Sequence, residues 1–551
     1  MTVHPGPDIT RGDETARDSF VIGTFTVLSR ATGVVRVVVL GAVLGPTFLG
    51  NAFQISNALP NLIYFGFLAG SLFSSLLVPV LVPHVDKRDR KHASLVSGGF
   101  LGVTWTVLLP VVPLAVLLLP DLLHVVGNGA GAGVTQLQLP AVRLLVLLTM
   151  PQVFLYAVVG SATAAMNAHR RFALASAAPA VENLGVIAVL AAVGFIYGGS
   201  SSQGDSPPVG ELLLLGIGST AAVAVHAGIQ WWGAYRNGVT IVPRRGWRQP
   251  EVVEILGRSL RAATQAGLLA VQMLALLVLA SRVGGGSVAI QMGLNFYFLP
   301  IALIATPVGL ALLPRLSRLH IKGDRIEFGR VFIDGLTLAL FLAIPAAVGY
   351  VVLAEPLARA LSAGQMNTPF ALHMITASIA ALALGLIGQT IFFVSTQAAY
   401  SRGDTRTPLR SMFLQAAICL AICAVSPFVP DASLNAVLGA SFAVGSLAAG
   451  AHQLHRVTRD DHISARPLVG SLARAGSGAL AMAVTVWLTV SAVEPSNTHR
   501  TGWIVTLLVG SGVGLATYLL SQAAMRSPEL SRLRSAVRGH RSPLADVGDA
   551  T

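Results

Sequence analysis

Two arginines, Arg30 and Arg36, stand six residues apart in an otherwise apolar run near the start of the chain. A charged side chain at the centre of a bilayer costs about 2.5–3.5 kcal/mol on insertion scales, so both residues are functional candidates. A guanidinium group binds phosphate through two parallel hydrogen bonds. The pair therefore predicts a site for a phosphate or pyrophosphate group. Snorkelling of Arg30 to the membrane surface is the alternative.

Other polar side chains also interrupt apolar runs. Glu182 needs a counter-ion or a proton in such surroundings. A charge partnership with Arg30 or Arg36, proton uptake during transport and a purely structural ion pair all stay open. Amide side chains in two further runs predict hydrogen bonds either to a cargo head group or between helices, namely those of Asn51, Asn57, Asn61, Gln291 and Asn295. The spacings typical of metal sites and of nucleophilic catalysis are missing, so the sequence predicts no catalytic residue, no metal and no cofactor.

The elements that hold these residues must be membrane-spanning helices. Of the 551 residues 54% are hydrophobic and only 11% are charged, against about 25% charged in soluble domains. This composition excludes a cytosolic enzyme, a secreted disulfide scaffold and a disordered regulator. A spanning helix needs about 20 apolar residues. Fourteen such runs predict an all-α polytopic membrane protein, with spans at 19–45, 52–83, 93–119, 139–166, 171–197, 210–235, 259–283, 287–314, 330–353, 370–399, 407–429, 433–455, 470–492 and 502–524.

The distribution of Lys and Arg predicts the orientation. Cytoplasmic loops retain positive charge. If both tails and the even-numbered connections are cytoplasmic, 31 of the 37 Lys and Arg residues lie on that side. Opposite them are only Arg143, Arg282, Arg359 and Arg500. We therefore expect both termini in the cytoplasm.

An internal repeat divides the spans into two lobes. Pro60 and Pro300 occupy similar places 240 residues apart, and the basic loops that begin at Asn167 and Ser401 are 234 residues apart. Prolines at equivalent places predict hinges, because each removes a helical hydrogen bond; a static bend is the alternative. Two six-helix halves plus two C-terminal helices are a plan typical of transporters. The predicted parts are a cytoplasmic tail at 1–18, an N-lobe at 19–235, a basic linker at 236–258, a C-lobe at 259–455, spans 13 and 14 within 456–524, and a cytoplasmic tail at 525–551.

Four stretches carry a resemblance to a known family. They are Leu28-Ser-Arg-Ala-Thr-Gly-Val-Val-Arg36, Asn51-Ala-Phe with Leu59-Pro-Asn-Leu, Asn167-Ala-His-Arg-Arg-Phe172, and Tyr400-Ser-Arg-Gly-Asp-Thr-Arg-Thr-Pro408. The chain resembles the MviN/MurJ lipid II flippases of the multidrug/oligosaccharidyl-lipid/polysaccharide exporter superfamily. The last stretch is very close to the family's signature after span 10, which comprises Asp404, Thr405, Arg406 and Pro408 here.

The resemblance implies a function and a location. It implies a flippase that moves a polyprenyl-pyrophosphate-linked saccharide, first of all the peptidoglycan precursor lipid II, from the inner to the outer leaflet by alternating access. It implies a multi-pass protein of the bacterial cell membrane, acting in cell-wall synthesis and cell shape, with cell-wall synthesis proteins as further partners. Arg30 and Arg36 would face the cargo pyrophosphate.

The chain departs from the family pattern at several cavity positions. Tyr64 stands where the family places arginine after the Pro60-Asn61 pair, Asn295 aligns with a further arginine, and Asn51 replaces an aspartate. These residues would have to bind the cargo in place of the missing charges. Two alternatives follow from this: an exporter of another lipid-linked glycan or lipid-like product in the same fold, and a transport-dead cell-wall scaffold.

Overall fold

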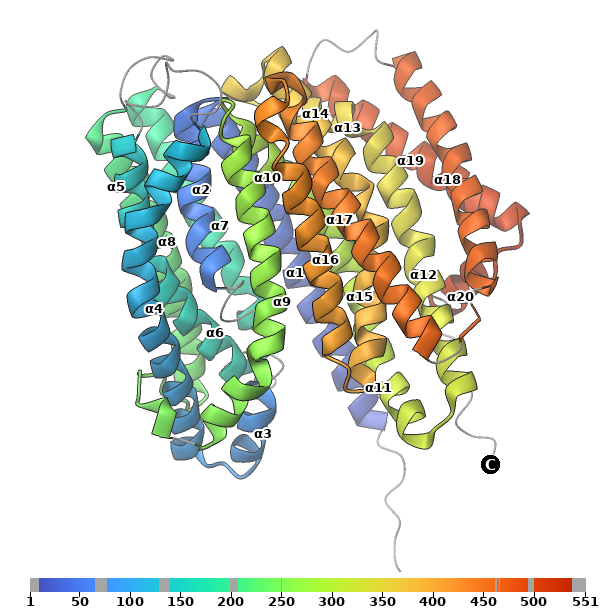
Figure 1. Ribbon diagram of the computed structural model, residues 1–551, viewed down its shortest axis with the longest axis horizontal. Coiled ribbons are helices and arrows are strands. Elements are labelled where there is room, and N and C mark those ends of the chain that lie inside the picture. The colour runs from blue at the N-terminus through green and yellow to red at the C-terminus, as the bar shows by residue number, and fades with distance from the viewer. Residues whose placement is uncertain are drawn as a thin grey trace, which may run out of the picture. The chain divides into compact units, whose positions relative to one another are not determined.

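The fold is known from a computed structural model, which describes residues 9–64, 77–127, 139–169, 171–198, 207–248, 250–460, 463–464, 466–493 and 500–537. Every regular element among these residues is a helix (Figure 1). This is what a bilayer requires, because a helix satisfies its backbone hydrogen bonds internally. The all-α prediction is confirmed.

Thirteen helices in the described part of the chain are long and apolar enough to cross a membrane. They match thirteen of the predicted spans, from Val27–Leu44 to Arg500–Ala524. The remaining predicted span, 52–83, contains α2 (Phe48–Ile63) and α3 (Val78–Asp86), and its middle lies outside the described residues.

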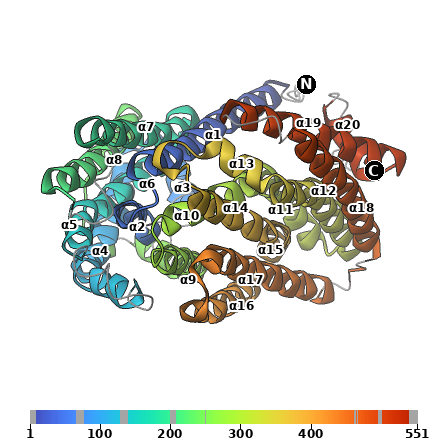
Figure 2. The same cartoon turned by 90° about the horizontal axis from the view of Figure 1, so that it is seen from above.

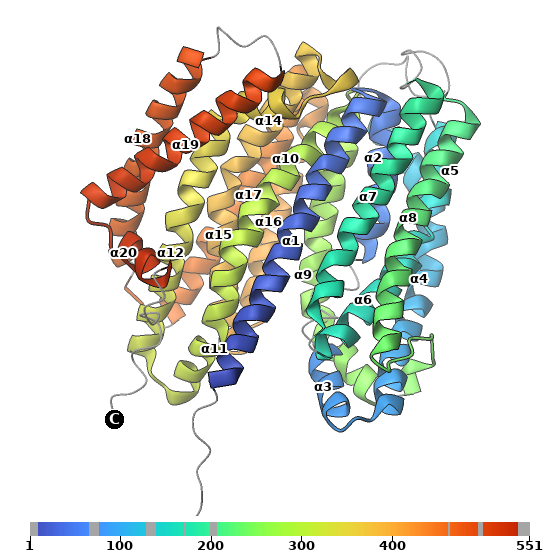
Figure 3. The same cartoon turned by 180° about the vertical axis from the view of Figure 1, so that it is seen from behind.

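The first compact unit comprises residues 1–288 with 363–365. In it α1 packs along α7, α7 along α8, and α6 against α8, so that α1, α7 and α8 lie side by side (Figure 3). The other α-helices that lie wholly in this unit are α2, α3, α4, α5 and α9. The bounds are α1 (Ile9–Leu44), α4 (Arg90–Gly127), α5 (Leu139–Thr149), α6 (Gln152–Ala168), α7 (Phe172–Tyr197), α8 (Val209–Arg236) and α9 (Pro250–Ala280).

The second compact unit comprises residues 289–362 with 366–551. Its helix α17 packs against α14, α15 and α16, while α12 packs on α18 and α18 on α19 (Figure 2). Phe332, Leu336 and Phe341 form part of its core, where the Tyr518 hydroxyl donates to the Phe341 carbonyl at 2.7 Å. The bounds are α11 (Thr306–Lys322), α12 (Arg325–Val352), α14 (Pro369–Ala383), α15 (Gly385–Ser401), α16 (Arg406–Cys423), α17 (Asp431–Asp460), α18 (Arg466–Val493) and α19 (Arg500–Ala524).

Three helices remain to be described, α10, α13 and α20. Helix α10 (Gly286–Pro300) begins in the first unit and continues in the second. The sequence did not indicate α13 (Ala354–Leu361) and α20 (Pro528–Val537), which are too short to span a membrane. The division into lobes at the linker 236–258 stays a prediction.

Spans 4 and 10 share a feature that supports the repeat. The first is interrupted between α5 and α6 at Met150, and the second between α14 and α15 at Leu384. These interruptions are 234 residues apart, which is the offset of the basic loops that follow the two spans. The repeated halves therefore share a break in the helix as well as sequence landmarks.

Candidate functional site

Helix α1 presents the two predicted arginines within its apolar segment. Arg30 is exposed and Arg36 is partly buried. Asn183 of α7 fixes the register of α1, because its Nδ2 donates to the Ser29 carbonyl at 3.2 Å and to Thr32 Oγ1 at 3.1 Å. The neighbouring residue on α7 is Glu182, so this clamp holds the stretch of α1 that carries Arg36 against the helix that carries this carboxylate.

Glu182 is the centre of a buried polar cluster. The Tyr156 hydroxyl donates to Glu182 Oε1 at 2.8 Å, and His226 Nδ1 lies 2.7 Å from Oε2. The three residues come from α6, α7 and α8 and are 3%, 7% and 3% exposed, respectively. Sequence reasoning expected a partner for Glu182 among the arginines and missed Tyr156 and His226. The available signal was that His226 is the one histidine within the apolar run 210–235.

Two predicted residues of span 2 extend this cluster. The Tyr64 ring is fully buried and stacks on the Tyr156 ring, with 6.1 Å between centroids. Asn61 lies near the Tyr156 side chain. The first unit thus gathers Arg36, Asn61, Tyr64 and Glu182 around Tyr156. Their assignment as cargo-binding residues stays a prediction.

Asn51 has a different environment. Its Nδ2 donates to the carbonyls of Ser281 at 3.2 Å and Val283 at 2.7 Å, and its Oδ1 accepts from the Ser287 backbone N–H at 3.0 Å. The buried amide therefore joins the start of α2 to the connection between α9 and α10. Both amide hydrogens are used within the protein, which matches the helix-packing alternative for this residue.

Asn295 belongs to the second unit. It is partly buried on α10, where its Oδ1 accepts from Gln291 Nε2 one turn earlier at 3.3 Å. Among the residues that the structure describes, the Asn295 amide group donates no hydrogen bond, so it can donate to a ligand or a neighbouring helix. Its predicted role in place of an arginine stays a prediction.

The two predicted hinge prolines both disturb their helices. Pro60 lacks an amide hydrogen, so the Ser56 carbonyl loses its helical donor; Thr149 of α5 donates to that carbonyl at 2.9 Å instead. Pro300 ends α10 and is followed by the π-helical turn Ile301–Ala305. Such turns are sites of helix bending, so both positions suit hinges, which remain predicted.

The signature-like stretch at Tyr400–Pro408 forms the turn from α15 into α16. Gly403 adopts a φ of +74°, and its N–H donates to the Tyr400 carbonyl, which closes α15. Asp404 Oδ1 accepts from the backbone N–H groups of Arg406 at 2.9 Å and Thr407 at 3.1 Å, so it satisfies the first turn of α16. The contacts of this motif are those of a helix cap.

Removal of this cap has a measurable consequence. Asp404→Ala is expected to lower the free energy of unfolding by about 1 kcal/mol, as for other helix caps, whereas Asp404→Asn retains most of it. Burial raises the pKa of Asp404, but the hydrogen bonds from Thr407 and Arg406 outweigh burial and hold that pKa below its ordinary value of 3.8. The contribution is therefore complete above about pH 4 and declines as the pH falls through the lowered pKa. Thermal unfolding in detergent at several pH values tests this, and an equal loss in Asp404→Asn would contradict it.

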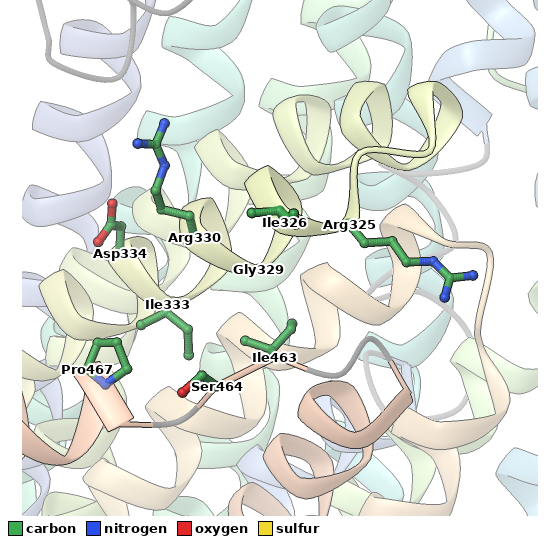
Figure 4. A pocket seen from close by; sticks show the side chains of 9 residues that line it. All are labelled: Arg325, Ile326, Gly329, Arg330, Ile333, Asp334, Ile463, Ser464 and Pro467. Carbon is green, nitrogen blue, oxygen red and sulfur yellow. The ribbon is translucent and has the colours of Figure 1, made fainter.

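A pocket in the second unit lies between α12 and the start of α18, with a volume of about 490 Å³. Figure 4 shows apolar side chains around it, including Ile333, Ile463 and Pro467. Two charged residues at its edge already have ionic partners: Arg330 pairs with Glu327 at 2.7 Å, and Asp334 pairs with Arg532 at 2.9 Å. None of the predicted cargo-binding residues lines it.

Comparisons with known proteins identify the family. The sequence model described as "Lipid II flippase MurJ" matches residues 40–509. The protein named "Probable lipid II flippase MurJ" of Vibrio cholerae is 26% identical over 421 residues, which cover 73% of this chain and 76% of that protein. "Lipid II flippase MurJ" of Burkholderia cenocepacia is 24% identical, with 72% and 75% covered.

Solved structures share the fold. "Lipid II flippase MurJ, inward closed conformation" superposes with a TM-score of 0.70 at 15% identity, covering 92% of this chain and 99% of that one. An inward-facing multidrug resistance MATE family transporter of the MOP superfamily superposes with a TM-score of 0.58 at 12% identity, covering 80% and 94%. The family model matches most of the chain, and the thirteen apolar helices of its described part are those of a polytopic membrane protein. The chain therefore belongs to the lipid II flippase MurJ family of membrane transporters.

Proposed function

We propose that this protein flips lipid II from the inner to the outer leaflet of the bacterial cell membrane. Membership of the MurJ family over residues 40–509 is the observation that carries the proposal. Flipping breaks no covalent bond, so the protein has to bind the cargo head group and exchange between inward- and outward-open states. The two alternatives, another lipid-linked cargo and a transport-dead scaffold, gain no support from the comparisons.

The proposed cargo site contains Arg36 and the residues gathered around Tyr156. The pyrophosphate of lipid II is an anion that a guanidinium binds through charge-assisted hydrogen bonds. Arg36 is partly buried and held on α1 by the contact of that helix with α7, so it is positioned before cargo arrives. Arg30 is exposed and would meet the cargo nearer the membrane surface. Asn61, Tyr64 and Asn295 would donate hydrogen bonds in place of further arginines.

The remaining proposals concern topology and partners. Both termini would lie in the cytoplasm, since 31 of 37 basic residues then lie on that side. The N-lobe at 19–235 and the C-lobe at 259–455 would rock about Pro60 and Pro300. Cell-wall synthesis proteins would be partners, because lipid II is consumed at the outer leaflet.

Complementation tests the cargo. Expression of this chain in a bacterium depleted of its own lipid II flippase is expected to restore growth and outer-leaflet lipid II. An otherwise identical plasmid without the gene is the control. Correct membrane insertion without any rescue would contradict lipid II as the cargo and would favour a different lipid-linked cargo.

A further inference from the structure

One ring nitrogen of His226, in the Glu182 cluster, makes no hydrogen bond to any described residue. His226 Nδ1 faces Glu182 Oε2 at 2.7 Å, while Nε2 is buried without a hydrogen-bond partner among the described residues. An ionised carboxylate only accepts hydrogen bonds, so Nδ1 must carry the hydrogen of this contact. Nε2 is consequently the atom at which His226 gains or loses a proton.

A charged carboxylate in dry surroundings needs a nearby positive charge. Two groups can provide it for Glu182: the imidazolium form of His226, and Arg36, whose charge acts on both Glu182 and Tyr156. If His226 is protonated, the Glu182–His226 pair is neutral as a whole. If His226 is neutral, the pair carries one negative charge, and Arg36 is the cation that compensates it.

Three other charged groups of this unit have partners or lie further away. Arg143 pairs with Asp121 at 2.8 Å, and the Arg236 guanidinium lies over the Trp232 ring. Glu211 is 15 residues from His226 on α8, which is about 22 Å along a helix. The described titratable groups on α7, α8 and the helices packed against them are Arg30, Arg36, Tyr64, Arg143, Tyr156, His169, Glu182, Tyr197, Glu211, His226, Tyr235 and Arg236.

We propose that Glu182 and His226 form a proton-binding site that competes with anionic cargo for Arg36. One proton from solution binds His226 Nε2, the imidazolium neutralises Glu182, and Arg36 becomes available to a pyrophosphate. Loss of that proton leaves Glu182 with a negative charge that attracts Arg36, which weakens cargo binding. By linkage, cargo binding then takes up a proton.

Burial gives this exchange a place in the transport cycle. Because Nε2 is shielded from solvent, a proton reaches it only in a state in which the cluster is hydrated. Proton binding is thereby tied to the opening of the first unit, as cargo entry and release are. The proposal rests on the proposed function for the identity of the cargo, but not for the proton site itself.

Two substitutions with opposite expected effects test the competition. The full chain in lipid nanodiscs is titrated with lipid II between about pH 5 and 8, where histidine changes charge. Wild-type affinity is expected to fall with rising pH, by at most about tenfold per pH unit for one linked proton. Glu182→Gln removes the competitor, so its affinity stays high at every pH. His226→Gln leaves Glu182 uncompensated, so its affinity stays low at every pH.

The matched control is Glu211→Gln, a buried carboxylate on the same helix as His226, which is expected to keep the wild-type pH dependence. A merely structural role for the cluster would move both test variants in the same direction. That result, or wild-type pH dependence in both, would overturn the proposal.

A second measurement separates the proton site from the cargo. Nuclear magnetic resonance of ring-labelled histidine follows the titration of His226 without lipid II, with His226→Gln identifying the signal. We expect this titration to shift in Arg36→Ala and to stay unchanged in Arg143→Ala. A shift together with no binding of lipid II at any pH would contradict the cargo alone. An unshifted or missing titration would overturn the proton site whatever the cargo.

Discussion

Arg36→Ala is expected to abolish transport while the protein still inserts and folds. The substitution removes the guanidinium that we place against the cargo pyrophosphate, and α1 remains an apolar helix packed along α7. Glu182 keeps His226 and Tyr156 as hydrogen-bonding partners, and protonation of His226 leaves the Glu182–His226 pair neutral without Arg36. Growth under depletion of a resident flippase measures the loss, and the protein content of the membrane fraction shows whether insertion is intact.

Two companion variants sharpen this test. Arg36→Lys keeps the charge but loses the paired hydrogen bonds, so partial activity is expected. Arg143→Ala removes an exposed arginine of the same unit, which pairs with Asp121, and should leave growth unchanged. Full rescue by Arg36→Ala would show that this arginine does not bind the cargo.

Gly388→Leu is expected to destabilise the second unit strongly. Helices α15 and α17 approach so closely that a Cβ atom at Gly388 would lie 2.5 Å from the Leu447 backbone, while one at Gly450 would meet the Gly388 carbonyl. Small residues permit such backbone contact between membrane helices. A backbone cannot move aside as a side chain does, so we expect a loss of about 3 kcal/mol or more, at the upper end for overpacking. Size-exclusion chromatography of the detergent-solubilised protein measures the folded fraction.

The control for this substitution lies in the same unit. A Cβ atom at Gly476 of α18 or Gly512 of α19 would meet nothing within 4 Å. Leucine at either position should therefore give a monodisperse protein with nearly wild-type thermal stability. Aggregation of all three variants alike would mean that added apolar bulk, and not helix contact, is responsible.

The spans were predictable because hydropathy is a property of each segment by itself. Thirteen of them agree with the described spans, although two of their ends differ by eight residues. Short amphipathic helices are not detected by the hydropathy of a long window. One example is α13, which packs against α14 and α19 through one face, with Arg359 lying over the Trp503 ring. Their stability comes from tertiary contacts that a sliding window does not register.

The candidate site was predictable residue by residue but not as a set of contacts. Arg36 and Glu182 stood out because charges in apolar runs are costly. The pairing of Glu182 with His226 depends on how α7 and α8 are rotated against each other, and these residues are 44 positions apart. Asn51 was similarly ambiguous, because an amide offers the same hydrogen bonds to a ligand as to the carbonyls of Ser281 and Val283.

The cap at Asp404 also bears on how members of this family are recognised. In Tyr400–Pro408, Gly403 and Asp404 complete the backbone hydrogen bonds where α15 turns into α16. A match to these nine residues therefore indicates that a chain makes this turn, and it does not identify the cargo. A relative that had evolved to carry a different molecule would be under the same pressure to keep them. Paralogues with different cargos should accordingly be told apart at the positions proposed to bind cargo, such as Tyr64 and Asn295.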